Sequence, residues 1–147
     1  MKHKGHIIIN KPLEFVTDCF ANPDYLGEYQ DNFVRKDFIS GDKGKTGAVS
    51  KMYYTFGKKG EMELTETITK NELPHTFEAF YHHKHMDNTM ICNFSAIDDN
   101  TTRYDYEYEY TRIDWVMPKL MAILFPSMYK KPAEKWLSQF KAFVERQ

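Results

Sequence analysis

The segment AEKWLSQFKAFV, residues 133–144, decides the fold. Its apolar residues recur at i, i+3 and i+4, the pattern of an amphipathic helix, whereas its charged residues lie mostly on the opposite side. The apolar stripe consists of Ala133, Trp136, Leu137, Phe140 and Val144. The spacing predicts a C-terminal helix of about 20 residues that begins near Ser127–Pro132 and buries Trp136 and Phe140 most deeply.

Between residues 33 and 112 the apolar period changes from that of a helix to the two-residue alternation of β-strands. The predicted strands are Phe33–Ser40, Ala48–Phe56, Glu61–Lys70, Thr76–Lys84, Asn88–Ile97 and Thr101–Arg112. Short turns rich in Gly, Pro, Asp and Asn separate them. Because parallel strands need long crossover connections, this series predicts an antiparallel meander.

The first part of the chain adds a strand and two short helices. His6–Asn10 is a β-branched run that predicts a strand, and Leu13–Ala21 has helical spacing after Pro12. Asp24 is the expected N-cap of a second helix, Tyr25–Tyr29. Residues 1–147 therefore predict a single α+β domain, in which a curved seven-stranded antiparallel sheet grips the C-terminal helix and leaves a hollow beneath it.

Composition excludes several classes of protein. The 147 residues carry 20 basic and 21 acidic side chains, a balance that argues against a nucleic-acid partner. The longest apolar run, Leu120–Phe125, is far shorter than the roughly 20 residues of a transmembrane helix. We therefore expect no integral membrane segment. Without a secretory signal, we expect a cytoplasmic protein with Cys19 and Cys92 as free thiols.

Tyrosines alternate with acids in the last predicted strand. Tyr104, Tyr106, Tyr108 and Tyr110 share one face, and Asp105, Glu107 and Glu109 share the other. An inner aromatic wall above a solvated acidic face is the ordinary interpretation. The functional alternative makes one or two tyrosine hydroxyls polar anchors for a ligand in the hollow.

Glu66 is the weak candidate for a catalytic acid or base. It shares the apolar face of its strand with Met62, Leu64 and Ile68. Burial without a cation raises a carboxyl pKa and would suit a general base or a polar anchor. A β-bulge that turns Glu66 to solvent, or a salt bridge to a neighbouring Lys or Arg, remains the alternative.

The candidate ligand-binding residues are those whose phase points into the expected hollow. They are Met52, Tyr54, Met62, Leu64, Glu66, Met90, Cys92, Phe94, Tyr106, Tyr108, Leu120, Leu124, Met128, Trp136 and Phe140. Adaptable methionines and aromatic rings make a wall suited to a flexible apolar molecule, although ordinary core packing explains many of them. No cofactor is expected. The His82–His85 cluster predicts no metal site, because the spacing marks no third ligand.

The order of elements resembles the START-like or SRPBCC superfamily, which includes the birch pollen allergen and polyketide cyclase families. The resemblance extends over nearly the whole chain, from the opening IIINKPLEFV of residues 7–16, through Asn22-Pro23-Asp24 and the Gly41–Gly47 loop, to the ending FKAFVE of residues 140–145. It implies a helix-grip fold with an internal cavity. The predicted helix Trp115–Phe125 is more apolar than an entrance region requires, so a lid, a homodimer contact and a membrane contact stay open.

Three functions follow from this interpretation. The first is a binding or carrier domain for a small hydrophobic or aromatic molecule. The second is an enzyme of the polyketide cyclase or dehydratase type, with Glu66 or a tyrosine moving a proton. The third is a protein-interaction module, which would show a filled cavity and an exposed apolar patch.

Overall fold

The computed structural model describes residues 2–56, 58, 60–114 and 132–147. The predicted helix Trp115–Phe125 lies outside these residues, as does its suggested dimer contact. Leu120, Leu124 and Met128 lie outside them too. Among the helices that are described, none is long and apolar enough to cross a membrane.

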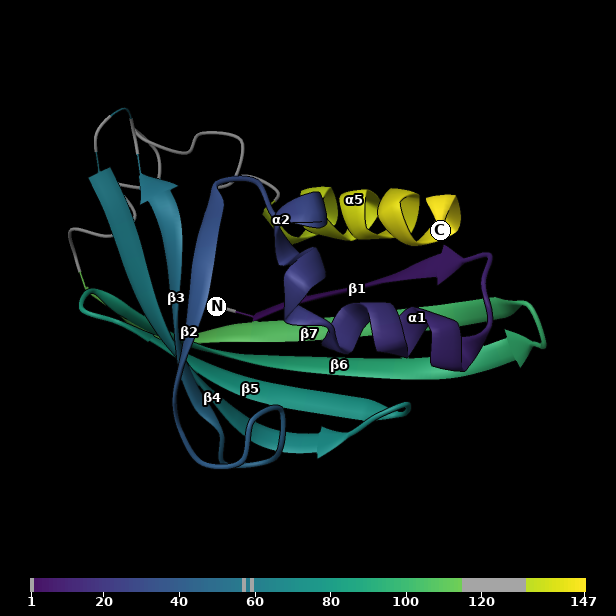
Figure 1. The fold of residues 1–147 in the computed structure, drawn as a ribbon, viewed down its shortest axis with the longest axis horizontal. Coiled ribbons are helices and arrows are strands. Elements are labelled where there is room, and N and C mark those ends of the chain that lie inside the picture. Colours follow the sequence, from purple (N-terminus) through teal and green to yellow (C-terminus); the bar gives the residue numbers. More distant parts are fainter. Residues whose placement is uncertain (1, 57, 59, 115–131) are drawn as a thin grey trace.

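One antiparallel sheet of seven strands forms the body of the molecule (Figure 1). The strands are β1 (Lys2–Ile9), β2 (Phe33–Ser40), β3 (Val49–Phe56), β4 (Gly60–Glu72), β5 (Thr76–His83), β6 (Met86–Asp98) and β7 (Thr101–Ile113). Their spatial order is β1-β7-β6-β5-β4-β3-β2, so β2 to β7 form the predicted meander and β1 closes onto β7. The predicted sheet is confirmed.

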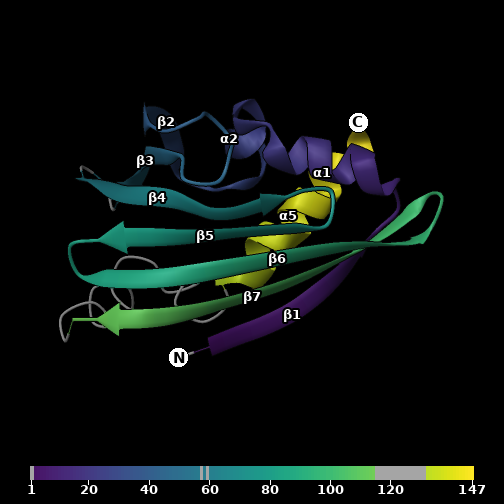
Figure 2. The ribbon, with the colours of Figure 1, turned by 90° about the horizontal axis from the view of Figure 1, so that it is seen from below.

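The described helices pack on one side of this curved sheet. They are α1 (Leu13–Ala21), the 3₁₀ turn η1 (Pro23–Tyr25), α2 (Leu26–Tyr29) and α5 (Pro132–Arg146). In Figure 2 the strands lie in front and α5 crosses behind them. The expected N-cap Asp24 is wrong: the side chain of Asn22 accepts the hydrogen bond, from the Asp24 N–H at 2.9 Å.

Burial of the apolar stripe holds α5 against the sheet. Leu137, Phe140, Phe143 and Val144 are all buried. Phe20 of α1 contributes to the same packing, with ring-to-ring contacts to Phe77, Phe94, Tyr104 and Phe140 at centroid distances between 5.1 and 6.1 Å. Aromatic side chains therefore fill the space between the sheet and the helices around α1.

Polar contacts fix the ends of α5. Near its start, the side chains of Lys135 and Gln139 both bind the carboxylate of Asp31, in the turn before β2. Near its end, Glu145 accepts a hydrogen bond from the Asn10 N–H at 2.7 Å. The helix is thus tied both to the β2 side of the sheet and to the end of β1.

Candidate functional site

A cavity of about 820 Å³ lies between the concave face of the sheet and the helices. Its wall takes side chains from β2 to β7, α1, α2 and α5. This volume is within the range of small-molecule sites in proteins, which is roughly 300–1,000 Å³. The helix-grip arrangement therefore leaves a hollow large enough for a small organic molecule.

Most of the wall is apolar or aromatic. The residues that provide this surface include Phe20, Leu26, Phe33, Met52, Tyr54, Met62, Leu64, Ile68, Phe77, Met86, Met90, Tyr106, Tyr108, Trp136 and Phe140. Rings and flexible methionines stand on several sides of the space. Burial of apolar ligand surface against such a wall is favourable by about 25 cal/mol for each Å² removed from water.

A row of polar side chains crosses the floor of the cavity from strand to strand. Ser50 of β3 pairs with Glu66 of β4, Glu66 with Tyr81 of β5, and Tyr81 with Asn88 of β6. All four residues line the cavity. Directly opposed side chains on adjacent strands stand roughly 5 Å apart, so this register creates a continuous polar band in a mainly apolar wall.

Glu66 is buried and paired. Only 4% of its surface is exposed, as its phase predicted. Its Oε1 lies 2.8 Å from the Nζ of Lys36, and its Oε2 accepts a hydrogen bond of 2.7 Å from the Tyr81 hydroxyl. The expectation that Glu66 is buried without a cation is therefore wrong. The alternative, a salt bridge to a neighbouring lysine, is what the structure contains.

Lys36 is the residue of this site that the strand pattern missed. Plain alternation from Phe33 puts Lys36 on the opposite face from Phe33. A register shift between Phe33 and Arg35 inserts an extra residue, so Phe33 faces inward opposite Tyr54 and Lys36 faces inward opposite Met52. The signal that could have found it is the phase that Lys36 shares with Phe38, which also lines the cavity.

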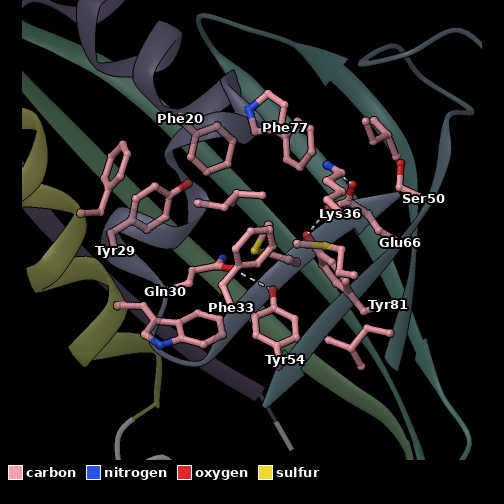
Figure 3. Close-up of a pocket in the computed structure, with 18 of the residues that line it drawn as sticks. Phe20, Tyr29, Gln30, Phe33, Lys36, Ser50, Tyr54, Glu66, Phe77 and Tyr81 are labelled. Atoms are coloured by element: carbon pink, nitrogen blue, oxygen red, sulfur yellow. Dashed lines mark hydrogen bonds and ion pairs between the residues drawn. The ribbon is translucent and has the colours of Figure 1, made fainter. Parts of the chain in front are cut away.

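Figure 3 shows Lys36, Ser50 and Glu66 grouped on one wall, while Phe20 and Tyr29 stand across the space from them. The polar group is thus confined to one part of the cavity, and apolar rings face it.

A second polar contact lies where the cavity meets α5. The Tyr54 hydroxyl donates a hydrogen bond of 2.7 Å to Gln30, and its ring stacks on Trp136 with centroids 5.9 Å apart. Trp136 is only half-buried, whereas 2% of Phe140 is exposed. The expectation that Trp136 is among the most buried residues is therefore wrong, because one part of its ring faces the hollow rather than packed atoms.

Burial keeps the tyrosine hydroxyls of the wall in their neutral form. Desolvation raises the pKa of Tyr81 and Tyr54 well above the usual range, and the Glu66 carboxylate raises both pKa values further. A neutral phenol can donate a hydrogen bond, whereas a phenolate cannot. Both hydroxyls therefore keep donating, Tyr81 to Glu66 and Tyr54 to Gln30, across the physiological pH range.

The structure divides the predicted ligand-binding residues into three groups. The first group lines the cavity and consists of Met52, Tyr54, Met62, Leu64, Glu66, Met90, Tyr106, Tyr108, Trp136 and Phe140. Cys92 and Phe94 do not line it. Leu120, Leu124 and Met128 lie outside the described residues.

Cys92 and Phe94 are buried in packed core instead. The Cys92 sulfur lies 3.2 Å from the Tyr104 hydroxyl, and the Phe94 ring packs against Phe20 and Tyr104. Phase alone placed them on the inner face, but α1 covers that part of the sheet. Their predicted place in the cavity wall is corrected accordingly.

His82, near the end of β5, and His85, in the turn that follows, contact carboxylates that are ion-paired with Arg112. His82 Nδ1 lies 2.6 Å from Asp87, and His85 Nδ1 lies 3.3 Å from Asp114. Arg112 binds both carboxylates, at 2.9 Å each. Within the described ranges no group of three His, Cys, Asp or Glu side chains is arranged to hold a metal ion.

Comparison with known proteins gives similarity in fold and little in sequence. No family model matches the chain, and a search of curated proteins also finds no match. Among solved structures, the aromatase/cyclase ZhuI from Streptomyces sp. R1128 superposes with a TM-score of 0.78 at 8% identity, over 99% of this chain and 94% of that one.

Two further structures are similar over nearly their whole length. Ara h 8.0201 has a TM-score of 0.75 at 8% identity and covers 100% of this chain and 99% of its own. A conserved protein from Geobacillus kaustophilus has a TM-score of 0.75 at 17% identity, over 99% of this chain and 93% of that one. The chain therefore has the START-like, or SRPBCC-like, helix-grip fold, as its sequence resemblance implied.

Proposed function

We propose that this chain is a binding or carrier domain that holds a small hydrophobic or aromatic molecule between the sheet and α5. The observation that carries the proposal is the cavity of about 820 Å³, whose wall is mainly aromatic and aliphatic. Filling it would remove apolar surface from water on both the ligand and the wall.

The polar groups of the wall support binding with a fixed orientation. A typical ligand site combines an apolar surface with a few polar groups that select one pose. In this proposal the polar row would meet one end of a ligand, and the stacked rings of Tyr54 and Trp136 would meet its body.

A cyclase-type enzyme is the second candidate, because ZhuI, whose structure is similar, is an aromatase/cyclase. Glu66 is the buried acid among the described wall residues, and each of its oxygens already has a partner, Lys36 on one and Tyr81 on the other. A proton accepted from a substrate would neutralise this carboxylate and leave the Lys36 ammonium without its counter-charge. This geometry favours binding over proton transfer.

Native mass spectrometry of the protein isolated from its own source tests the proposal directly. A carrier should retain a bound small molecule, which appears as a constant mass added to that of the chain and is lost on unfolding. A protein that stays free of added mass after exposure to extracts of its source would contradict the proposal.

A cavity-filling variant tests the location of binding. Leu64→Trp enlarges a half-buried wall residue, so saturable binding of the neutral probe N-phenyl-1-naphthylamine should weaken by about tenfold or more. Thr69→Trp is the control, because Thr69 is exposed on the same strand and outside the wall. Equal affinity in both variants would place the probe on the surface.

A further inference from the structure

The ammonium of Lys36 has unused hydrogen-bonding capacity inside the cavity. An ammonium carries three donors. In the described part of the chain its partner is the Glu66 carboxylate, at 2.8 Å. Lys36 is largely covered, with 24% of its side chain exposed, and it lines the cavity. Two N–H groups are therefore left for a molecule in that space.

Ser50 contributes an unpaired hydroxyl beside this ion pair. Only 5% of its surface is exposed, and it faces the cavity. None of the residues that the structure describes forms a hydrogen bond with its side chain. The hydroxyl is not among the described side-chain atoms that are fully buried and lack a partner, so it is open to the cavity and can donate or accept a hydrogen bond there. Since Ser50 pairs directly with Glu66, this free hydroxyl and the ion pair lie side by side (Figure 3).

The charge balance of this cluster decides which ligand group it suits. Lys36 and Glu66 together carry no net charge. An anionic ligand would meet the Glu66 carboxylate within a few ångströms, and a cationic one would meet Lys36. Either would also lose its own hydration, and this cluster holds no unpaired opposite charge to receive it. The other lysine of the described wall, Lys43, is exposed and lies in the Gly41–Gly47 loop outside the cluster. The cluster therefore disfavours charged groups of both signs.

A hydroxyl group matches the remaining donors and acceptors. It can accept a hydrogen bond from Lys36 or Ser50 and donate one to Glu66, whose carboxylate oxygens have lone pairs to spare. A carbonyl group could only accept.

We infer that the ligand of this cavity is a neutral hydrophobic molecule with an alcohol or phenol group, and that Lys36, Ser50 and Glu66 bind this group. The inference rests on the proposed binding function and specifies the chemical class of the ligand.

Three probes that share one ring system test this inference: naphthalene, 2-naphthol and 2-naphthoate. Each should displace N-phenyl-1-naphthylamine from the cavity at pH 7. We expect 2-naphthol to bind about tenfold more tightly than naphthalene, the scale of one or two hydrogen bonds to partly charged partners. We expect 2-naphthoate to bind at least tenfold more weakly than 2-naphthol, because its charge must be desolvated beside Glu66.

Variants identify the groups responsible for the preference. The double variant Lys36→Met with Glu66→Gln removes both charges together, and Ser50→Ala removes only the free hydroxyl. The readout is the ratio of 2-naphthol affinity to naphthalene affinity within each variant, which cancels a general change in the cavity wall. The first variant should lower this ratio to near one, and the second should lower it severalfold. Ser50→Ala keeps the test decisive if the double variant does not fold.

The matched control is Lys51→Met with Glu63→Gln. These residues form an exposed cross-strand ion pair on the same strands, β3 and β4, with 3.1 Å between Nζ and Oε1. Their side chains alternate with Met52 and Leu64, so they lie on the outer face of the sheet. This control should keep the full preference for 2-naphthol.

Two failures are distinguishable. If the reporter and naphthalene bind in the cavity but 2-naphthol gains nothing, or 2-naphthoate binds most tightly, the inference is wrong and the binding function stands. If the reporter itself does not bind the parent protein saturably, the binding function fails and the inference falls with it.

Discussion

At the scale of single residues, the ion pair between Lys36 and Glu66 determines how substitution of either residue changes the stability of the protein. The Glu66 carboxylate is paired with the Lys36 ammonium and the Tyr81 hydroxyl, so removing its charge gives no gain in stability. It instead leaves the Lys36 ammonium in a largely apolar space without its counter-charge. Breaking one partner of a buried pair destabilises, whereas replacing both partners is often neutral.

We therefore predict that Glu66→Gln lowers the free energy of unfolding by about 1–3 kcal/mol, a value reduced because Lys36 is partly exposed. The double variant Lys36→Met with Glu66→Gln should recover most of this loss. Urea unfolding at pH 7 measures both. The exposed pair Lys51–Glu63 supplies the comparison, since Glu63→Gln should leave the free energy of unfolding almost unchanged. A Glu66→Gln variant as stable as its parent would contradict the argument.

At the scale of elements, α5 combines two roles along one stripe. Val144 lies in packed core, and Phe140 packs against several rings at the inner edge of the cavity. Trp136, one turn earlier than Phe140, is less buried and stacks on Tyr54 at the cavity. One helix thus holds the fold together at its end and forms the binding wall near its start.

Two alanine substitutions should separate these roles. Phe140→Ala should cost about 3–5 kcal/mol of stability, because it opens a void in close-packed surroundings. Trp136→Ala should cost less, about 1–3 kcal/mol, but should weaken binding of N-phenyl-1-naphthylamine by about tenfold, because it removes a wall of the cavity. Thermal unfolding and probe titration on both variants make the comparison. The reverse ranking of stability would place Trp136, not Phe140, in the packed core.

The sequence predicted those elements whose faces are set by burial. The stripe of α5 and the alternation of the strands report which side chains leave water, and the structure follows both. Strand ends were less predictable, because they depend on distant partners. The turn after β5 was predicted at Met86-Asp87 but lies at Lys84-His85. There Arg112 of β7 donates hydrogen bonds to the carbonyls of His83 and Lys84.

Part of the candidate site could not be predicted from the sequence either, because it too depends on contacts with other parts of the chain. Period two assigns a face only while the pairing is regular, and the irregularity between Phe33 and Arg35 changes the phase and brings Lys36 inward. Cys92 and Phe94 show the opposite error. Both face inward as predicted, but Phe20 of α1 packs over Phe94, and Cys92 is fully buried beside the Tyr104 hydroxyl. Nothing in their own strand reveals this packing.

At the scale of the whole molecule, burial of weak acids couples stability to alkaline pH. Desolvation raises the pKa of Cys92 from 9.0 to about 12 and raises the pKa values of Tyr29 and Tyr104 above their usual range. Each of these groups ionises more readily in the unfolded chain. Their contribution to stability is therefore complete below the unfolded pKa and declines as pH rises toward the folded one.

For Cys92 the window runs from pH 9 to about pH 12. Across it the parent should lose stability faster than Cys92→Ala, by up to about 1.4 kcal/mol for each pH unit. Urea unfolding at several pH values gives the two slopes, which should agree between pH 6 and 8. Parallel slopes above pH 9 would show that the thiol ionises equally well in both states.

The pairing of β1 with β7 has a consequence for the order of assembly. Residue 2 lies opposite residue 109, whereas each strand from β2 to β7 pairs with its neighbour in the chain. During synthesis the meander can grow strand by strand, since each new hairpin closes only a short loop. β1 is made before the rest of the sheet, but its template is completed only when β7 emerges. The first strand of this sheet therefore waits for the last, and its docking completes the sheet after the meander has formed.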